Sequence, residues 1–341
     1  MDNTKERKQL IIYIAIAYGV TYLMGLLMWY GNSRQLDLTT FPTAQMFYPA
    51  AGVMAAFLCT KKDDAMVPRL FYWFFVLATV VMAAFAVLSI CKPNEIIIVM
   101  GTGMSLWAVG QQYLMIAVCV VGWVLLLITK KEKRRAYGLC WNSGISSWWY
   151  IFLFMLLYFG RVAVSVAISG EFAAFSSILK SATFWIQLAV LPVNFFLLFA
   201  AFFGEEYGWR YYLQPFLQKR FGLRGGVLLL GLVWGIWHLP VDLFYYTQDS
   251  QFMMVLTQHV TCVTLGIFFA YAYMKTNNIW VPVILHYLNN NLVPIISGNY
   301  SASVLENQTV TWKDLLVSLV INGLVFGGFL LTKPFRTKTQ S

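Results

Sequence analysis

Charged residues are scarce in this sequence. They make up 11% of its 341 residues, whereas hydrophobic residues make up 60%. Soluble globular domains contain about 25% charged and about 45–50% apolar residues, so the composition excludes a soluble globule. It predicts a polytopic membrane protein. The net charge of +10 is dispersed in short loops between apolar stretches, which is typical of cytoplasmic loops, and no nucleic-acid partner is expected.

Paired cysteines are also absent. Cys59, Cys91, Cys119, Cys140 and Cys262 show no regular spacing, which excludes a disulfide framework and a zinc ribbon as interpretations. No serine or cysteine has an evident base at helical spacing, so covalent catalysis is disfavoured. The first apolar run, at 10–30, is too long for a signal-peptide core and lacks a small-residue cleavage site, so we expect a retained first span.

Long apolar runs dominate what is present. A membrane helix needs about 20 mostly apolar residues and satisfies its own backbone hydrogen bonds. We therefore predict an all-α, polytopic transmembrane bundle of about ten spans. They are 10–30, 43–60, 68–90, 111–129, 147–168, 183–204, 227–247, 252–274, 279–297 and 314–332. The segments 95–110 and 170–182 are weaker, and we expect interfacial or re-entrant structure there.

Lysine and arginine are distributed unequally between alternate loops. With the N-terminus inside, most basic residues fall on the inner side, including Lys5, Arg7, Lys8, Lys61, Lys62 and the stretch 130–135. The positive-inside rule then predicts a multi-pass plasma-membrane protein whose two ends are both cytoplasmic.

A few polar side chains occur where the chain is otherwise apolar. An ionisable group at the centre of the bilayer costs about 2.5–3.5 kcal/mol, so a chain that keeps several usually uses them. These groups cluster in three segments, which contain Glu205, Glu206 and Arg210, then His238, and then His286 with Asn290.

Helical spacing separates the roles of the two adjacent glutamates. Glu206 and Arg210 are four residues apart, so they share a helix face and can form an ion pair that braces the helix end. Glu205 points about 100° away from that face. We therefore expect Glu205 to face a cavity, and we expect structural support from Glu206 and Arg210.

The histidines also have partners at helical spacing. Trp234 precedes His238 by four residues, and His286 precedes Asn290 by four. His238 lies roughly 16 Å and His286 roughly 10 Å from the inner side of its span. With Glu205 at the inner end of the sixth span, all three can meet in the cytoplasmic half of the membrane.

Two pairs of glycines allow close helix packing. Gly204 with Gly208, and Gly231 with Gly235, form small-xxx-small faces, along which helix backbones approach one another. Short polar side chains on separate helices need such an approach to touch.

The residue types suggest hydrolysis. A carboxylate beside imidazoles can hold and deprotonate a water molecule. An asparagine amide and a histidine N–H can donate to an oxyanion that forms at an attacked carbonyl. This set therefore predicts hydrolysis of a peptide bond by activated water.

The order of the three motifs resembles a known family. "EEYGWR" (205–210), "WGIWH" (234–238) and "HYLNN" (286–290) are similar to the motifs of the CAAX-protease and bacteriocin-processing family of intramembrane proteases. The resemblance implies that Glu205 is the water-activating base and that His238, His286 and Asn290 complete the site. It also implies a cytoplasm-facing cavity. The expected substrate is a peptide or protein tail, such as a bacteriocin, a pheromone precursor or a CAAX-like protein.

Trp234 stands where the family commonly has phenylalanine, and it keeps an aromatic ring there. The first five spans carry no readable signature. The sequence therefore divides into N-terminal membrane helices (1–180), a protease core (181–300), and an outer loop with the last span and tail (301–341).

The involvement of a metal stays open at this point. The family is described both as metalloproteases and as metal-free glutamate proteases. The sequence has no H-E-x-x-H motif, which favours a site without a cofactor. Glu205, His238 and His286 could still supply the three ligands that a catalytic zinc takes.

Other interpretations also stay open. Asp242 either orients His238 or is an interface charge. The whole chain could be a non-catalytic bacteriocin-immunity or scaffold protein, or, less expected, a secondary transporter, whose polar groups would be found in both halves. The expected partners are a peptide substrate and membrane lipids, and the sequence indicates no oligomeric state.

Overall fold

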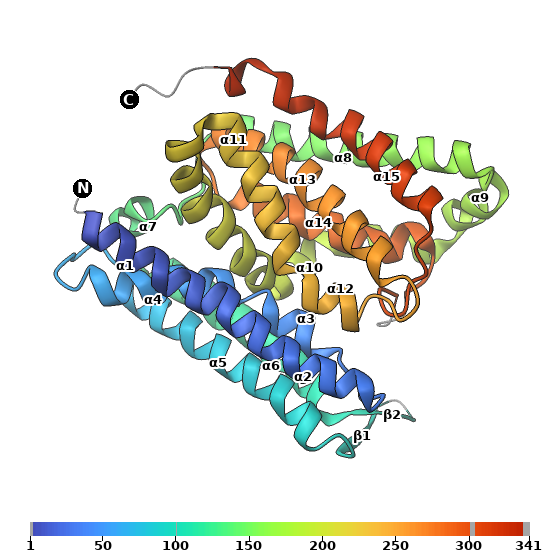
Figure 1. Cartoon of the computed structure of the whole chain (residues 1–341), viewed down its shortest axis with the longest axis horizontal. Coiled ribbons are helices and arrows are strands. Elements are labelled where there is room, and N and C mark those ends of the chain that lie inside the picture. Colours follow the sequence, from blue (N-terminus) through green and yellow to red (C-terminus); the bar gives the residue numbers. More distant parts are fainter. Residues whose placement is uncertain (1–2, 100, 301–303, 337–341) are drawn as a thin grey trace. The chain divides into compact units, whose positions relative to one another are not determined.

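The chain packs as two compact units made of interleaved stretches. The structure is a computed structural model that describes residues 3–99, 101–300 and 304–336 (Figure 1). Unit 1 comprises Met1–Cys140, Leu197–Tyr212 and Leu239–Tyr245, and unit 2 comprises Trp141–Phe196, Leu213–His238 and Tyr246–Ser341. These units do not follow the predicted segments 1–180, 181–300 and 301–341, which are defined by motif rather than by packing. Residues 301–303 and 337–341 of the third segment lie outside the described residues.

Unit 1 is a layer of helices from the N-terminal part of the chain. Neighbouring helices α1 and α4, α4 and α5, and α5 and α6 pack against each other. Its elements are α1 (Asn3–Ile14), the π-helical η1 (Ala15–Val20), α2 (Thr21–Ser33), α3 (Thr40–Gln45), α4 (Tyr48–Thr60), α5 (Arg69–Cys91), β1 (Ile96–Val99), β2 (Thr102–Ser105), α6 (Leu106–Ile128), α7 (Lys131–Ala136) and α12 (Leu239–Phe244).

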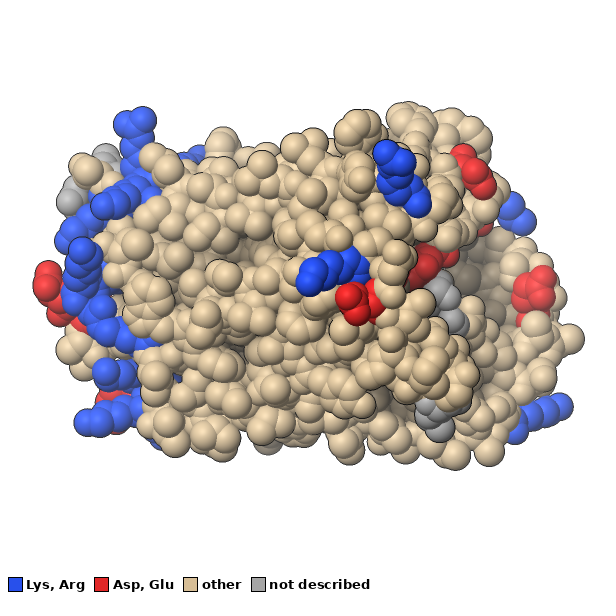
Figure 2. All heavy atoms as spheres, turned by 90° about the horizontal axis from the view of Figure 1, so that it is seen from below, with Lys and Arg blue, Asp and Glu red and all other residues tan. Residues whose placement is uncertain are grey.

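The basic stretches of unit 1 are tied together at one end of its helices. Gln9 of α1 donates to Thr60 Oγ1 of α4 at 2.9 Å, and the Tyr137 hydroxyl after α7 donates to Asp64 Oδ2 at 2.5 Å. The hydrogen bond from Tyr137 lowers the pKa of the Asp64 carboxyl. Figure 2 shows Lys and Arg gathered at one end of the visible face, beside a broad uncharged band. This grouping agrees with the predicted loop asymmetry, and the side of the membrane stays a prediction.

Unit 2 contains the later helices. α11 packs closely on α13, and a core formed by Val227, Ile267, Ala270 and Phe335 lies between these helices and the C-terminal segment. Its elements are α8 (Gly144–Ser169), α9 (Phe172–Lys180), α11 (Gln214–Trp237), α13 (Gln251–Thr276), α14 (Trp280–Ser297), α15 (Trp312–Val325) and the 3₁₀ turns η3 (Gly327–Leu331) and η4 (Lys333–Phe335). Helix α10 (Ala182–Glu206) begins in unit 2 and ends in unit 1, and the π-helical η2 (Tyr207–Leu213) follows it.

A glycine breaks the long helical stretch between the predicted sixth and seventh spans. Gly222 has φ 73° and ψ 170° inside α11, so two helices meet there. A Cβ at Gly226 would lie 2.6 Å from Gln218 Cα. The chain therefore folds back tightly on itself, which a glycine at positive φ permits.

The all-α, polytopic architecture is confirmed. Among the described residues, six helical segments are long and apolar enough to cross a membrane: Thr4–Ser33, Arg69–Cys91, Leu106–Ile128, Gly144–Ser169, Ala182–Trp237 and Gln251–Thr276. The predicted span 183–204 and the first part of the span 227–247 fall within the fifth segment. The predicted spans 43–60 and 279–297 contain the shorter helices α4 and α14, and the predicted span 314–332 overlaps α15. The count of ten spans stays a prediction.

Local structure differs from the sequence prediction at two places. The segment 95–110 contains an antiparallel hairpin, in which Ile96 of β1 pairs with Ser105 of β2, and it then enters α6. The seventh predicted span is interrupted because α11 ends at Trp237 and His238 caps it. Pro240 explains this end, since proline lacks the backbone N–H that would continue the hydrogen bonding of α11. The segment 170–182 forms the short helix α9.

The glycines of α10 and η2 fit against the backbone of unit 1. A Cβ at Gly204 would collide with the Met46 carbonyl oxygen, and a Cβ at Gly208 would collide with Pro49. The predicted close approach of Gly204 and Gly208 is therefore confirmed, and its partners are the link after α3 and the first turn of α4.

We predict that Gly208→Ala destabilises the protein by about 1–3 kcal/mol, the usual cost of overpacking a filled contact. Gly19 in η1 is a matched control, because a Cβ there meets nothing within 4 Å. Gly19→Ala should leave thermal unfolding in detergent unchanged or slightly raise its midpoint. Equal midpoints for the two variants would contradict the contact with Pro49.

Candidate functional site

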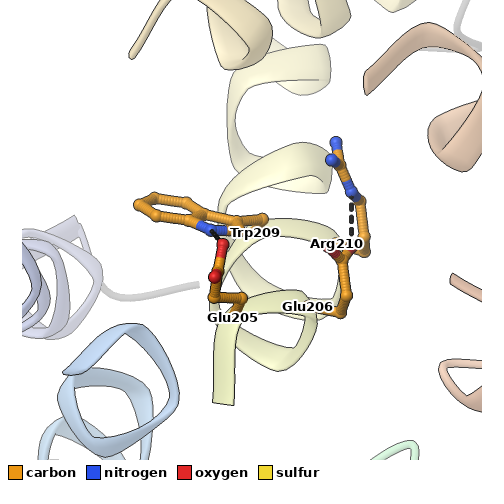
Figure 3. A network of polar contacts seen from close by, with 4 residues as sticks. All are labelled: Glu205, Glu206, Trp209 and Arg210. Carbon is orange, nitrogen blue, oxygen red and sulfur yellow. Dashed lines mark hydrogen bonds and ion pairs between the residues drawn. The ribbon is translucent and has the colours of Figure 1, made fainter. Parts of the chain in front are cut away.

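The first part of the candidate site is a buried ion pair in unit 1. Arg210 Nε donates to Glu206 Oε2 at 2.8 Å, and both side chains are fully buried (Figure 3). The predicted pairing at four-residue spacing is therefore confirmed. The helix does not end at Glu206, however, because η2 continues the helical backbone to Leu213. The pair thus lies within a helical stretch and spans its transition from α to π geometry.

Glu205 lies on another face of the same stretch. Figure 3 shows its carboxylate turned towards Trp209 rather than towards Arg210, and Trp209 Nε1 donates to Glu205 Oε2 at 3.4 Å. Glu205 is only 2% exposed. The expected divergence of the two glutamate side chains is therefore confirmed.

The first helical segment holds Trp209 in place. The Trp209 ring meets the edges of Tyr13 of α1 at 6.2 Å and Tyr18 of η1 at 6.1 Å between centroids. Aromatic pairs at this distance and angle are favourable. The N-terminal helices, which carry no readable signature, thus fix the indole that donates to Glu205.

His238 belongs to unit 2 and has a defined ring orientation. Its Nδ1 lies 2.9 Å from the carbonyl oxygen of Trp234. A carbonyl can only accept, so Nδ1 carries the proton, and in neutral imidazole Nε2 then carries the lone pair. The Cys262 sulfur lies 3.6 Å from Nδ1. His238 is therefore set up to accept a hydrogen bond through Nε2.

Trp234 joins the two predicted histidines. Its ring lies 5.8 Å from the His238 ring and 5.5 Å from the His286 ring, between centroids. His286 is buried and also faces Phe269 of α13 at 6.0 Å. The predicted aromatic wall beside His238 is confirmed, and the same ring lies beside His286. Unit 2 thus brings the imidazoles of α11 and α14 to one indole.

Asn290 lies one turn beyond His286 on α14 and is partly exposed. Its Oδ1 accepts a hydrogen bond from Asn289 Nδ2 at 3.0 Å. This bond leaves the Asn290 amide N–H groups available as donors. Asn291 instead bonds the Tyr287 carbonyl oxygen of its own helix.

Asp242 lies on α12 of unit 1 and is fully buried. Neither of its carboxylate oxygens has a hydrogen-bond partner among the residues that the structure describes. Nδ1 of His238 bonds Trp234 instead. A role for Asp242 in orienting His238 stays a prediction that no contact of the described residues supports.

Gly231 and Gly235 seat α11 on α13. A Cβ at Gly231 would lie 2.6 Å from Val263 Cα, and a Cβ at Gly235 would lie 2.6 Å from the His259 ring. The close approach is confirmed. The helix that α11 approaches is α13, which carries no predicted catalytic residue. His259 bonds the Val255 carbonyl oxygen of its own helix.

The residues of the predicted site are divided between the two units. Glu205 belongs to unit 1, whereas His238, His286 and Asn290 belong to unit 2. Among the described residues, no three His, Cys, Asp or Glu side chains are grouped as metal ligands. A zinc site would need Glu205 together with both histidines, and it stays a prediction.

Several contributing residues escape prediction from the sequence. Trp209 follows Glu205 by four residues, so helical spacing could have identified it. Cys262 and Phe269 come from α13, and no spacing links them to the histidines. The π-helical turn η2 has no evident sequence signal, although such turns are frequent at functional sites.

Residues 185–292 match a protein family described as "Type II CAAX prenyl endopeptidase Rce1-like". This range contains every motif on which the predicted resemblance depends, so the resemblance is confirmed.

Two relatives extend the comparison. "CAAX prenyl protease 2" of Methanococcus maripaludis is 27% identical over 151 residues, which are 42% of this chain and 54% of that protein. The chain thus spans about half the length of this relative. "Putative membrane peptidase YdiL" of Bacillus subtilis is 24% identical over 267 residues, 74% of this chain and 98% of that protein. No solved structure matches the chain.

We predict that Glu206→Leu costs about 3–5 kcal/mol of stability, because it leaves the Arg210 charge buried without its carboxylate. The double variant Glu206→Leu/Arg210→Met should recover most of this loss, since no charge is then left unpaired. Thermal unfolding in detergent measures both, with the exposed Glu95→Leu as the control. A double variant no more stable than the single one would contradict a compensated pair.

Proposed function

The chain carries the Rce1-like segment of the CAAX-protease family, and from this premise we propose that it is an intramembrane endopeptidase. Its activity is hydrolysis of a peptide bond by a water molecule activated by glutamate and histidine. The substrate is a peptide or protein tail that enters from the cytoplasm. The protein is a multi-pass membrane protein, and we place it in the plasma membrane with both ends inside.

The convergence of two histidines on Trp234 is the observation that carries this proposal. His238 of α11 and His286 of α14 are buried side chains on different helices, and both rings lie within 6 Å of the same indole ring centre. Packing alone would be served better by apolar side chains, because a buried polar group costs free energy unless it is bonded.

Glu205 joins this pair in the proposal through the chain itself. His238 is the last residue of its stretch of unit 2, and Leu239 begins the next stretch of unit 1. Pro240 in turn packs on Gly25 of α2. A Cβ added at Gly25 would lie 3.0 Å from the Pro240 side chain. The covalent link therefore attaches His238 directly to the unit that holds Glu205 and Trp209.

In the proposed mechanism, Glu205 removes a proton from water, and the resulting hydroxide attacks the scissile carbonyl carbon. Nε2 of His238 accepts the second hydrogen of the water and orients it. The Trp209 indole holds the carboxylate at the required angle. General-base catalysis of this kind contributes about 10²–10⁴-fold in rate.

The oxyanion is then stabilised by donors from α14. His238 is not one of them when neutral, because its N–H is already used on Trp234. The donors are the Asn290 amide and a His286 N–H. Collapse of the tetrahedral intermediate breaks the C–N bond, and the carboxylic acid of Glu205 returns its proton to the leaving amine. A zinc bound by Glu205, His238 and His286 is the alternative arrangement.

We predict that Glu205→Gln abolishes proteolysis while the protein still accumulates. The amide is nearly isosteric and can accept from Trp209, but it cannot take a proton from water. Mapping of new peptide ends in membrane proteomes should show ends with the native chain that are missing with the variant at equal abundance. This comparison also identifies the substrate and the cleavage site.

Glu95→Gln is the matched control, because Glu95 is an exposed carboxylate in the loop before β1. It should give the native profile. The proteolysis proposal is contradicted if cells with the native chain and cells with Glu205→Gln have the same peptide ends and also share a phenotype such as bacteriocin resistance. The protein then acts by binding.

We predict that Asn290→Leu lowers kcat about 10²–10³-fold with little change in KM, the usual effect of removing an oxyanion donor. Asn291→Leu is the control, since Asn291 bonds its own helix backbone. Cleavage kinetics on the substrate identified above measure both. A loss expressed only in KM would show that Asn290 binds the ground state instead.

A further inference from the structure

Arg161 is a charged side chain inside a membrane-spanning helix, and the proposed proteolysis makes no use of it. α8 has 26 residues and is long and apolar enough to cross a membrane. Arg161 lies about 7 Å from the midpoint of this helix along its axis. The hydrocarbon of a bilayer is about 30 Å thick, which puts the Arg161 backbone about 8 Å inside its edge.

The guanidinium is held by aromatic rings and a neutral amide. Its Cζ lies 4.4 Å from the ring centre of Tyr158 and 5.9 Å from that of Phe326. Nη1 donates to Asn322 Oδ1 of α15 at 3.3 Å, and Asn322 Nδ2 donates to Ser318 Oγ at 2.9 Å. All of these residues belong to unit 2.

None of these contacts supplies a negative charge. Among the described residues, no carboxylate forms an ion pair with Arg161, whereas the buried Arg210 has Glu206. A guanidinium has five N–H donors, and bonds to the neutral side chains of Asn322 and Tyr158 leave several of them unused among the described residues. An unpaired cation in hydrocarbon is unfavourable, so an anion is required from outside the chain.

The surroundings of Arg161 indicate where that anion comes from. Val164 and Ile168 of α8 are 47% and 54% exposed, and Leu324 of α15 is 76% exposed. These apolar side chains are exposed on the two helices that hold Arg161, and Arg161 is itself partly exposed. Figure 1 shows α15 beside α8, and it begins near the end of α8 that leads to α9. Exposed Trp312 at the start of α15 marks the level of the interface there.

We propose that Arg161, with Asn322 and Tyr158, forms a binding site for the phosphate of an anionic phospholipid between α8 and α15. The fork of N–H donors on the guanidinium matches phosphate oxygens in two-point contact. The acyl chains lie on the exposed apolar surface. The site is separate from the proposed catalytic residues, and it fixes the orientation of α15 on α8.

Native mass spectrometry of the full chain in neutral detergent tests this proposal. Phosphatidylglycerol and phosphatidylcholine with identical acyl chains are titrated against the native protein, Arg161→Gln, Arg161→Lys and Arg34→Gln. Arg34 is the matched control, because its guanidinium lies 5.7 Å from the ring centre of Tyr30 but at the end of α2. Folding is checked by thermal unfolding, and inorganic phosphate is tested in parallel.

The native protein should prefer phosphatidylglycerol. Arg161→Gln should weaken that binding about tenfold or more, with phosphatidylcholine unaffected, because a charge-assisted bond to phosphate is lost. Arg161→Lys should keep part of the preference, and Arg34→Gln should keep all of it. A preference that survives Arg161→Gln overturns the site, as does stabilisation by inorganic phosphate of equal size. If Arg161→Gln does not fold, two other results overturn the site. One is a native protein that does not prefer phosphatidylglycerol, and the other is an Arg161→Lys variant that has lost this preference entirely.

Discussion

The ion pair between Glu206 and Arg210 is the interaction on which the candidate site depends. Two adjacent carboxylates at buried positions repel one another and lose their hydration, and a fully buried arginine carries the same cost alone. The bond between Glu206 and Arg210 pairs two of these three buried charges and fixes the helix face on which they lie. Glu205 is then directed to another face by the helix itself, where its carboxylate meets the indole of Trp209.

Close backbone packing in unit 1 keeps this geometry rigid. Gly204 and Gly208 leave no room for a side chain against the segment 46–49, so α10 and η2 are fixed in depth and rotation. Tyr13 and Tyr18 then fill the space around Trp209. In a lipid environment there is no strong hydrophobic force between helices, so contacts of this kind supply most of the packing energy. The N-terminal helices thereby contribute to the orientation of Glu205, even though they lack a motif.

Helical spacing predicted the parts of the site that lie on one helix. The Glu206–Arg210 pair and the contact of Trp234 with His238 are both separations of four residues, and both are found. Hydropathy does not predict the end of α11 at Trp237, because the residues that follow in 227–247 are also mostly apolar. The signal for this end is Pro240. Contacts between helices, such as Cys262 with His238, depend on rotations that one sequence does not specify. The hairpin β1–β2 was missed because its apolar residues resemble a short membrane segment.

The tautomer of His238 divides the proposed work between helices. A backbone carbonyl one turn earlier in α11 takes its N–H, so this imidazole can only accept at its other nitrogen while it is neutral. It suits the attacking water and cannot serve the oxyanion. In the proposed mechanism the acyl oxygen is therefore stabilised from α14, where Asn289 bonds the amide oxygen of Asn290 and no bond from the Asn290 N–H groups is found among the described residues. Two local hydrogen bonds thus leave an acceptor on the His238 ring and donors on the Asn290 amide, which are the roles that the proposed mechanism gives them.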